Sequence, residues 1–219
     1  MILARWTAPQ RRNGGGDKLE IDPDGSYRLE RFTGITRVGY FAGALSDAEL
    51  QELNDAIEAA KAEPVDRAAA PMADGGEAVV TGAGYYMPTR GATTQSAQHA
   101  VLVLLRRLAM DLTRNPIAAV DVELLPAEQQ LLVRHVGSEP LHLERATLSL
   151  APGTGEPHSV EASPDGRIPS DDTAPQADWS THIALGPEAV GDFQVYADFL
   201  LVGSGATRPA QVTINSYAE

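Results

Sequence analysis

The feature that most constrains the fold is a segment that starts a helix near residue 46. Ser46 is followed three residues later by Glu49, the spacing of a capping box, in which each side chain accepts a hydrogen bond from the other residue's backbone N–H. Leu45 and Leu50 have the spacing of a hydrophobic staple around this cap, and Pro64 ends the helical pattern. The predicted apolar face consists of Leu50, Leu53, Ile57 and Ala60. We expect strands of the first half of the chain to pack against this helix.

A second helix is predicted to begin at Ser96 and to end before Asn115-Pro116. Its main apolar stripe consists of Val101, Leu104, Leu105, Leu108 and Leu112. Leu102, Val103 and Met110 add apolar side chains outside this stripe and leave little polar face. A helix that is apolar nearly all round is buried on more than one side. We therefore expect it to pack on the sheet and on a second surface, either the other domain or another subunit. Packing against another subunit would make the protein a homo-oligomer.

The first half also contains strand patterns. Residues 18–21 and 27–32 flank Asp22-Pro23-Asp24-Gly25, where proline and glycine stand at the positions that suit a type I turn followed by a bulge. This arrangement predicts a β-hairpin. Further strands are predicted at residues 2–7 and 36–41, and a further strand or hairpin at residues 78–87. With the two helices, these strands predict an α+β domain with an antiparallel sheet over residues 1–115.

From residue 119 onward the apolar pattern alternates with a period of two. Gly137-Ser138-Glu139-Pro140 predicts a hairpin between the strands on either side of it. The predicted strands lie at residues 120–124, 130–136, 141–150, 179–185, 192–202 and 210–217. Several short strands separated by turns, with no helical pattern, are typical of an all-β immunoglobulin-like sandwich. We predict such a domain over residues 119–219, without the cysteine pair of antibody domains.

The net charge of −13 is concentrated in the second half of the chain. Residues 1–118 carry 13 Lys and Arg against 15 Asp and Glu, a balance of −2. Residues 119–219 carry 4 against 15, a balance of −11. Nucleic acids and anionic membranes both need a positive partner surface, so we expect neither to bind. An acidic surface can attract a basic protein patch or a divalent cation, or it can serve solubility alone.

The composition also limits the chemistry and the compartment. Hydrophobic residues make up 43% of the chain, the mean hydropathy is −0.19, and there is no cysteine. This is a globular composition that excludes disulfides, thiolate metal sites and a cysteine nucleophile. Residues 1–7 are too short for a signal-peptide core, and the apolar run at residues 100–105 is too short to span a membrane. We expect a cytoplasmic protein.

The histidines supply the main candidates for chemistry. If the predicted hairpin turn closes, His135 and His142 form a cross-strand pair, and Glu144 lies on the same face. Two imidazoles and a carboxylate can bind zinc. In the alternative, His135 ends the inward row of Leu131 and Val133 and bonds its own loop, while His142 is solvated. The spacing matches no recognised metal motif, so we expect no metal or cofactor site.

Other catalytic patterns are not present in the sequence. Gly203-Ser204-Gly205 lacks the Gly-x-Ser-x-Gly nucleophile elbow, and His99 is expected to be a surface or capping residue in the first turn of the second helix. The aromatic residues Trp6, Tyr85, Tyr86 and Trp179 are expected to anchor the core. We therefore predict that the protein is not an enzyme and assign no catalytic residue.

Several features of the first half are shared with a known group of domains. These are Leu19-x-Ile21-x-x-Asp24-Gly25 in a hairpin, Phe41-Ala42-Gly43, and Leu45-Ser46-x-x-Glu49-Leu50 opening a helix, followed by a strand and a final helix. In this order of elements, residues 1–112 resemble small bacterial domains that include emfourin, an inhibitor of protealysin-type metallopeptidases. That group has a fuller hairpin between its helices and lacks the appended sandwich. The resemblance implies peptidase inhibition but assigns no residue to it.

These observations predict a non-catalytic protein-binding or scaffold protein, with peptidase inhibition as one specific form. The long loops at residues 62–77 and 153–178 are the expected contact surfaces, because binding residues concentrate on loops held by rigid elements. The alternative is a metal-binding protein or hydrolase that uses His135, His142 and Glu144.

Overall fold

The chain folds into two compact units, each with its own buried residues. The computed structural model describes residues 2–8, 17–63, 77–82, 85–88, 96–152, 158–162, 179–185, 189, 191–203 and 206–216. Unit 1 contains the described residues up to Arg31 together with those of Phe41–Asn115. Unit 2 contains Phe32–Tyr40 and the described residues of Pro116–Glu219. Within the described residues, the chain therefore enters unit 2 twice.

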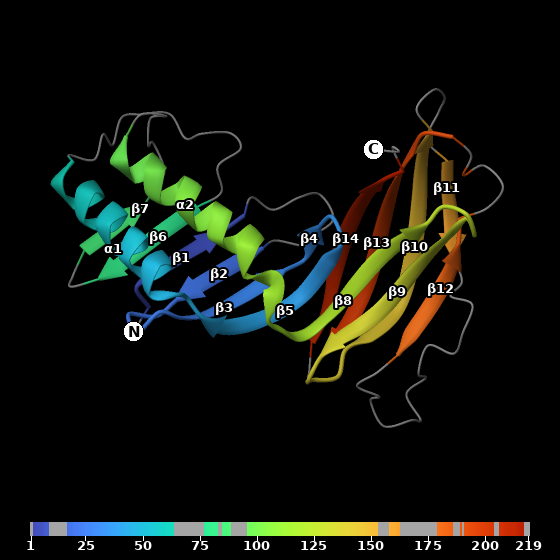
Figure 1. Cartoon of the computed structure of the whole chain (residues 1–219), viewed down its shortest axis with the longest axis horizontal. Coiled ribbons are helices and arrows are strands. Elements are labelled where there is room, and N and C mark those ends of the chain that lie inside the picture. The colour runs from blue at the N-terminus through green and yellow to red at the C-terminus, as the bar shows by residue number, and fades with distance from the viewer. Residues whose placement is uncertain are drawn as a thin grey trace. The chain divides into compact units, whose positions relative to one another are not determined.

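Unit 1 is a sheet covered on one face by helices (Figure 1). Its strands are hydrogen-bonded in the order β5-β3-β2-β1-β6-β7. Their bounds are β1 (Ala4–Thr7), β2 (Lys18–Ile21), β3 (Ser26–Arg31), β5 (Arg37–Ala44), β6 (Glu77–Gly82) and β7 (Tyr85–Pro88). The helices are α1 (Asp47–Ala62) and α2 (Ala97–Asp111), and α2 continues into the short 3-10 helix η1 (Leu112–Arg114). Strand β5 is divided, because its first four residues belong to unit 2.

The predicted hairpin in unit 1 is confirmed. Strands β2 and β3 pair antiparallel, with Ile21 opposite Tyr27. The Gly25 N–H donates to the Asp22 carbonyl over 2.9 Å, and the Asp22 N–H donates to the Ser26 carbonyl over 2.8 Å. Gly25 has a φ of +84°, a conformation that glycine adopts without steric cost. The turn residues of the sequence thus set both the position and the type of this turn.

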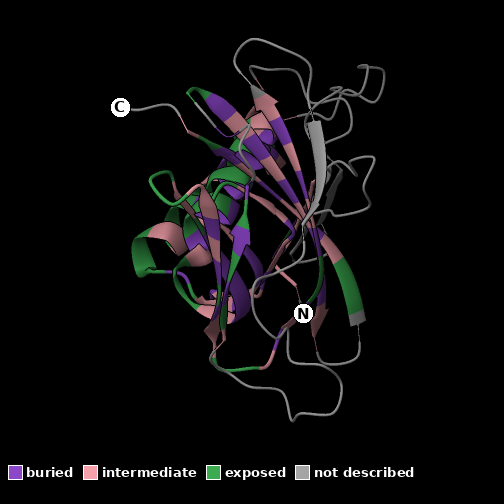
Figure 2. Cartoon of the chain, turned by 90° about the vertical axis from the view of Figure 1, so that its right-hand side faces the viewer, coloured by how far each residue is buried: buried purple, intermediate pink, exposed green. Residues whose placement is uncertain are grey.

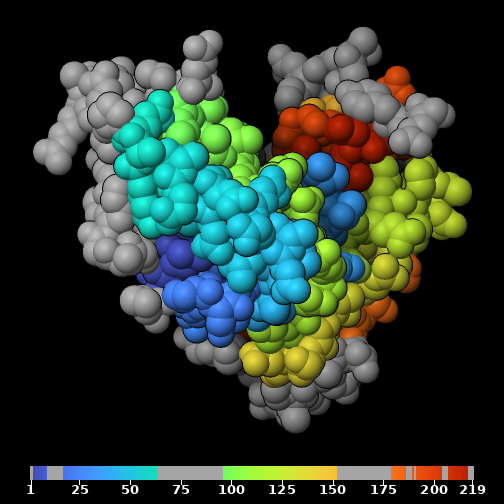
Figure 3. All heavy atoms as spheres, turned by 60° about the vertical axis from the view of Figure 1, so that its left-hand side comes forward, coloured from blue at the N-terminus to red at the C-terminus, as the bar shows by residue number. Residues whose placement is uncertain are grey.

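The capping box that opens α1 is also confirmed. The Ser46 hydroxyl accepts from the Glu49 N–H over 3.3 Å, and the Glu49 carboxylate accepts from the Ser46 N–H over 2.7 Å. The helix buries Leu53, Ile57 and Ala60. Its polar side chains form part of the outer surface of unit 1, where α1 is coloured cyan in Figure 3. The sequence pattern therefore predicted the start of the helix and three of the four residues of its buried face, whereas Leu50 is only partly buried.

The cap makes the stability of unit 1 depend on pH. The Ser46 N–H, the Ser46 hydroxyl and the positive charge of Arg114 lower the pKa of the Glu49 carboxyl. A carboxyl whose pKa is lower in the folded chain adds stability above its unfolded pKa of about 4.3 and loses it as the pH falls through the folded value. We expect Ser46→Ala to lower the free energy of unfolding by about 1 kcal/mol at neutral pH, and by less in acid.

Ser96→Ala is the matched control for this prediction. The Ser96 hydroxyl caps α2 by accepting from the His99 N–H over 3.1 Å, and a histidine stands where Glu49 stands in the α1 cap. The Glu63 carboxylate bonds the Ala97 N–H at this helix start, a contact that Ser96→Ala leaves in place. We expect Ser96→Ala to lower the free energy of unfolding by a similar amount at neutral and acid pH. Urea unfolding of both variants across this pH range measures the difference. A Ser46→Ala loss that stays constant with pH would contradict the assignment.

Polar contacts join the two helices of unit 1 at their ends. The Gln98 side chain, only 4% exposed, donates to the carbonyls of Ala60 (3.3 Å) and Glu63 (3.2 Å) at the end of α1. The Glu63 carboxylate in turn accepts from the Ala97 N–H at the start of α2. Arg114 pairs with Glu49 over 3.0 Å. Gln98 therefore adds a hydrogen bond to the Ala60 carbonyl, which also accepts from the Glu63 N–H, and supplies one to the Glu63 carbonyl at the end of α1.

Helix α2 is buried on one broad side only. Its buried residues are Gln98, Val101, Leu102, Leu104, Leu105, Leu108 and Ala109. Val103 is 51% exposed and Met110 56% exposed, so the prediction that this helix is buried nearly all round is wrong for these two residues. Helix α1 supplies a second packing surface besides the sheet. A homo-oligomer formed through α2 stays a prediction.

Unit 2 consists of two sheets in the described part of the chain. The first has the order β12-β9-β8-β5, and the second has the order β11-β10-β13-β14-β4. The additional strands are β4 (Thr33–Gly34), β8 (Pro116–Leu125), β9 (Gln130–Gly137), β10 (His142–Pro152), β11 (His158–Ala162), β12 (Ser180–Ala184), β13 (Phe193–Gly203) and β14 (Ala206–Asn215). With the helices of unit 1, this confirms the predicted α+β class with a β-rich second half.

The two sheets of unit 2 enclose one hydrophobic core. Buried and more exposed residues alternate along the strands, as Figure 2 shows by colour. The first sheet contributes Val120 and Val133 to this core, and the second contributes Leu148, Val195 and Val212. Alternation with a period of two places one row of side chains inside and the other outside. This agrees with the pattern read from residue 119 onward.

The segment Phe32–Tyr40 pairs with both sheets of unit 2. Strand β4 runs parallel to β14, and the Gln211 N–H donates to the Phe32 carbonyl over 2.8 Å. In the other sheet, the Val122 N–H donates to the carbonyl of Thr36, which precedes β5, over 2.7 Å. Phe32 and Val38 are 3% and 0% exposed in the unit 2 core. This segment was expected in a domain of residues 1–115, whereas it packs with residues 116–219.

Candidate interaction surfaces

The structure does not form the predicted histidine pair. Strand β9 lies in the first sheet of unit 2, where His135 is opposite Val120 of β8. Strand β10 lies in the second sheet, where His142 is opposite Val202 of β13. The predicted hairpin through residues 137–140 is therefore wrong, because the chain crosses between sheets there instead of turning back beside β9. Glu144 lies at an irregularity in the pairing of β10 with β13, and its side chain is exposed.

His135 follows the alternative interpretation of the sequence. It is 6% exposed, ends the buried row of Leu131 and Val133, and its Nε2 lies 2.9 Å from the Glu139 carbonyl. Its ring centroid lies 6.2 Å from that of Trp179. His142 is half-buried and not fully solvated. Within the described residues, no three His, Asp or Glu side chains gather closely enough to hold a metal ion.

Other residues singled out from the sequence lie in structural positions. Trp6 is 5% exposed, and Trp179 packs against the unit 2 core while its Nε1–H donates to the Leu141 carbonyl over 2.7 Å. Both therefore anchor cores, as predicted. His99 is half-buried and its N–H takes part in the α2 cap. The side chains of Tyr85 and Tyr86, and the residue Ser204, lie outside what the structure describes.

The two predicted contact loops are described only in part. Residues 64–76 of the first loop lie outside the described residues. In the second, residues 153–157 and 163–178 lie outside them. Residues 158–162 form β11, which pairs antiparallel with β10. The prediction of one continuous loop over 153–178 is therefore wrong at β11.

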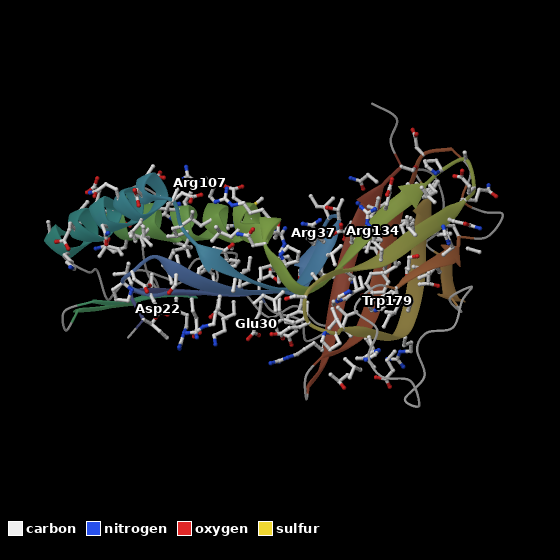
Figure 4. All side chains as sticks on the ribbon, turned by 60° about the horizontal axis from the view of Figure 1, so that its bottom comes forward. Asp22, Glu30, Arg37, Arg107, Arg134 and Trp179 are labelled. Carbon is white, nitrogen blue, oxygen red and sulfur yellow. The ribbon has the colours of Figure 1, made fainter. Side chains whose placement is uncertain are left out.

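One face of the unit 1 sheet carries a network of charged side chains. Glu20 lies at its centre, 2.7 Å from the Arg5 guanidinium and 3.0 Å from the Lys18 ammonium. Arg28 reaches Glu20 over 4.0 Å and Asp22 over 3.6 Å. Asp22 and Glu30 lie on the side of the sheet away from the helices, whereas Arg107 extends from α2 (Figure 4). Because opposite charges are paired, this face is a solvated surface with little net charge.

A second ion pair fixes β5 against β8 in unit 2. The Arg37 guanidinium binds the Asp121 carboxylate through two nitrogens, Nη2 over 2.8 Å and Nε more closely. These hydrogen bonds raise the pKa of Arg37. Arg134 approaches the same carboxylate over 3.5 Å, and both arginines are labelled in Figure 4. Asp121 is only 9% exposed, and the two arginines are its ion-pair partners.

We expect the two arginines to contribute unequally to stability. Arg37→Gln should lower the free energy of unfolding by about 1–3 kcal/mol, below the cost of breaking a fully buried pair because solvent reaches the Arg37 side chain. Arg134→Gln should cost less than about 1 kcal/mol, since this side chain is half exposed and its contact is longer. Denaturant unfolding of the two variants measures both values. Equal losses would contradict the assignment of Arg37 as the main partner.

The sheet edges of both units are the remaining candidate surfaces. The strand orders place β7 at the edge of the unit 1 sheet, and β12, β11 and β4 at edges in unit 2. Strand β7 ends in Pro88, β11 contains Glu161, and β4 is only two residues long. Proline, charge and short length are features that protect edges from pairing with other chains. Strand β12, Ser-Thr-His-Ile-Ala, has none of the three.

The chain matches no protein-family model, no curated protein and no solved structure. The resemblances to emfourin-like domains and to immunoglobulin-like sandwiches therefore stay predictions. No helix in the described part of the chain is long and apolar enough to cross a membrane. Residues 179–185 read as a strand from sequence, but their place at an edge follows from the strand order, which no local pattern encodes.

Proposed function

We propose that this is a non-catalytic binding protein or scaffold whose unit 2 attaches to a protein partner. The observation that carries the proposal is the charge distribution. Residues 119–219 hold 15 Asp and Glu against 4 Lys and Arg. A surface of one sign attracts a partner of the opposite sign and speeds its association. A cytoplasmic location fits a chain with no cysteine.

The proposal includes an immunoglobulin-like identity for unit 2. One sheet has the order β12-β9-β8, and the other has the order β11-β10-β13-β14. These orders correspond to strands E, B and A facing C′, C, F and G of an immunoglobulin-like sandwich, with Phe32–Tyr40 adding a strand to each sheet. Such frameworks present loops and edges to partners while the core stays rigid. The sandwich predicted at 119–219 would then also include Phe32–Tyr40, and the α+β domain predicted at 1–115 would lack this segment.

Inhibition of a peptidase is the specific form that the resemblance of residues 1–112 implies. The test mixes the intact protein with a protealysin-type metallopeptidase and follows initial rates on a peptide substrate. The expected result is a lower rate, while the protein stays uncut on a gel. Deletion of residues 64–76 or of residues 163–178 should relieve the inhibition. Unchanged rates with the intact protein would remove this form of the proposal.

The broader proposal is tested with a partner in hand. The intact protein is immobilised on a resin and incubated with an extract of the cells that express it. Proteins that cross-link to it are identified and purified, and their binding to the intact protein is measured by calorimetric titration. The affinity is expected to fall as the salt concentration rises, because salt screens exposed charges over a Debye length of about 8 Å at physiological ionic strength. Absence of any stoichiometric partner, or an affinity that is independent of salt, would contradict binding through the acidic surface.

A further inference from the structure

We propose that strand β12 is a docking edge to which a basic, extended peptide segment of the partner adds as a further strand. This inference rests on the proposed function of unit 2 and names the surface and the partner chemistry. Addition of a strand to a sheet edge uses main-chain hydrogen bonds for affinity and alternate side chains for specificity. The strand order of the described residues ends at β12, which has β9 as its neighbour on one side.

The register shows which backbone groups of β12 point outward. The His135 N–H donates to the Trp179 carbonyl over 2.9 Å, and the Leu185 N–H donates to the Gln129 carbonyl over 2.9 Å. Bonded residues alternate along an antiparallel pair. The backbone groups of Thr181 and Ile183 therefore face β9. Those of Ser180, His182 and Ala184 face the outer edge.

The side chains of β12 suit an added strand. Thr181 and Ile183 are buried, whereas Ser180, His182 and Ala184 are exposed. A strand paired with the outer edge would continue both rows, with apolar residues on the core side and polar residues on the solvent side. Strand β12 contains no charged residue, and neither bulge nor proline interrupts its five pairs with β9. Among the described residues, this edge carries none of the features by which natural sheets ordinarily prevent pairing.

Charge complementarity selects the occupant. Residues 168–207, which contain β12, carry no Lys or Arg. The acidic residues in the described part of this range are Asp192 and Asp198, and residues 119–219 as a whole hold 15 Asp and Glu against 4 Lys and Arg. The Arg134 side chain, opposite Ser180 on β9, already approaches Asp121. A second copy of this chain would bring the same negative charge, whereas a segment that alternates Lys or Arg with β-branched residues would be attracted.

The probe is a peptide of about seven alternating lysine and valine residues, the length of an ordinary strand, blocked at both ends. Its binding to the full-length protein is measured by fluorescence anisotropy. His182→Pro removes one outward N–H, and proline is tolerated at an edge where that N–H faces solvent. We expect His182→Pro to weaken binding about tenfold. The control His182→Val, which keeps the backbone N–H, should bind like the unchanged protein.

Two altered peptides keep the test decisive if His182→Pro fails to fold. A peptide methylated on alternate backbone nitrogens, and one with glutamate for lysine, should both fail to bind. Equal binding by His182→Pro and the unchanged protein, or by the methylated peptide, would overturn the inference. So would a concentration-dependent dimer that His182→Pro abolishes. The purified partner could bind the unchanged protein and the His182→Pro variant equally while the peptide binds neither. In that case the assignment of β12 as the docking edge is wrong and the proposed function stands.

Discussion

A fragment of residues 116–219 alone is expected not to fold, although it contains most of unit 2. It would lack Phe32 and Val38, each buried in the core, and burial of such side chains contributes about 1.5–3 kcal/mol apiece. It would also lack Arg37, the main partner of the Asp121 carboxylate. Strands β8 and β14 would each lose a neighbour. These losses are comparable to the whole stability of a domain, about 5–15 kcal/mol.

A linked fragment is the matched control for this prediction. The Ala42 N–H donates to the Asn115 carbonyl over 3.4 Å and the Val122 N–H to the Thr36 carbonyl over 2.7 Å, so β5 and β8 run antiparallel. The first bond also shows that residues 42 and 115 lie close together. Residues 31–42 can therefore be joined to residues 115–219 by an Asn-Gly turn, which suits a two-residue hairpin. Thermal unfolding followed by circular dichroism should be cooperative for the linked fragment only. A cooperative transition in the bare fragment, or none in either, would contradict the role given to residues 32–40.

Gly39→Ala is expected to lower the free energy of unfolding by about 3–5 kcal/mol, from a strained backbone and a close contact together. Gly39 has a φ of +141°, which side chains other than hydrogen rarely allow. A Cβ there would lie 2.4 Å from the Ala118 carbonyl oxygen and 2.5 Å from the Ala119 Cα. Both contacts are with the backbone of β8, which moves only if the pairing of β5 with β8 is disturbed.

Gly191→Ala separates the two causes. Gly191 also has a positive φ, +75°, but a Cβ there would meet nothing within 4 Å. We expect this substitution to cost about 1 kcal/mol, the conformational term alone. Denaturant unfolding of the full-length variants measures both losses. Equal losses at the two positions would show that the approach of β5 to β8 contributes nothing, and would contradict the close packing described for this pair.

Local signals in the sequence predicted the local structure well. The turn Asp22-Pro23-Asp24-Gly25 and the caps at Ser46 and Ser96 depend on contacts within a few residues, and each forms as expected. The alternating pattern after residue 119 likewise predicted strands. In these cases the hydrogen-bond partners are neighbours in the chain, so spacing alone determines the geometry.

The predictions that were wrong concern which strands become neighbours in the sheets. Residues 137–140 carry turn signals, but such signals do not say whether the chain turns within one sheet or crosses to the other. Gly137, with a φ of +123° and a would-be Cβ 2.2 Å from the Ile117 carbonyl oxygen, lies against β8 at that crossing. The predicted cluster of His135, His142 and Glu144 depended on the wrong choice. The pairing of Phe32–Tyr40 with residues of unit 2 is equally non-local.

Buried polar residues were also missed from sequence. Gln98 occupies the second position of α2, where a polar residue is ordinary, and its role arises only because the end of α1 lies beside it. Asp121 reads as the outward residue of an alternating strand, yet Arg37, distant in sequence, partners it. The edge position of β12 was likewise not predictable from local sequence, because it depends on the order of the whole sheet.

Hydrogen exchange with the purified partner bound is the most direct test of protein binding through unit 2. In the free protein, the outward amides of Ser180, His182 and Ala184 should exchange faster than those of Thr181 and Ile183, which are bonded to β9. Binding of the partner should slow the three outward amides. Slower amide exchange in unit 1 alone, with exchange in β12 unchanged, would contradict protein binding through unit 2.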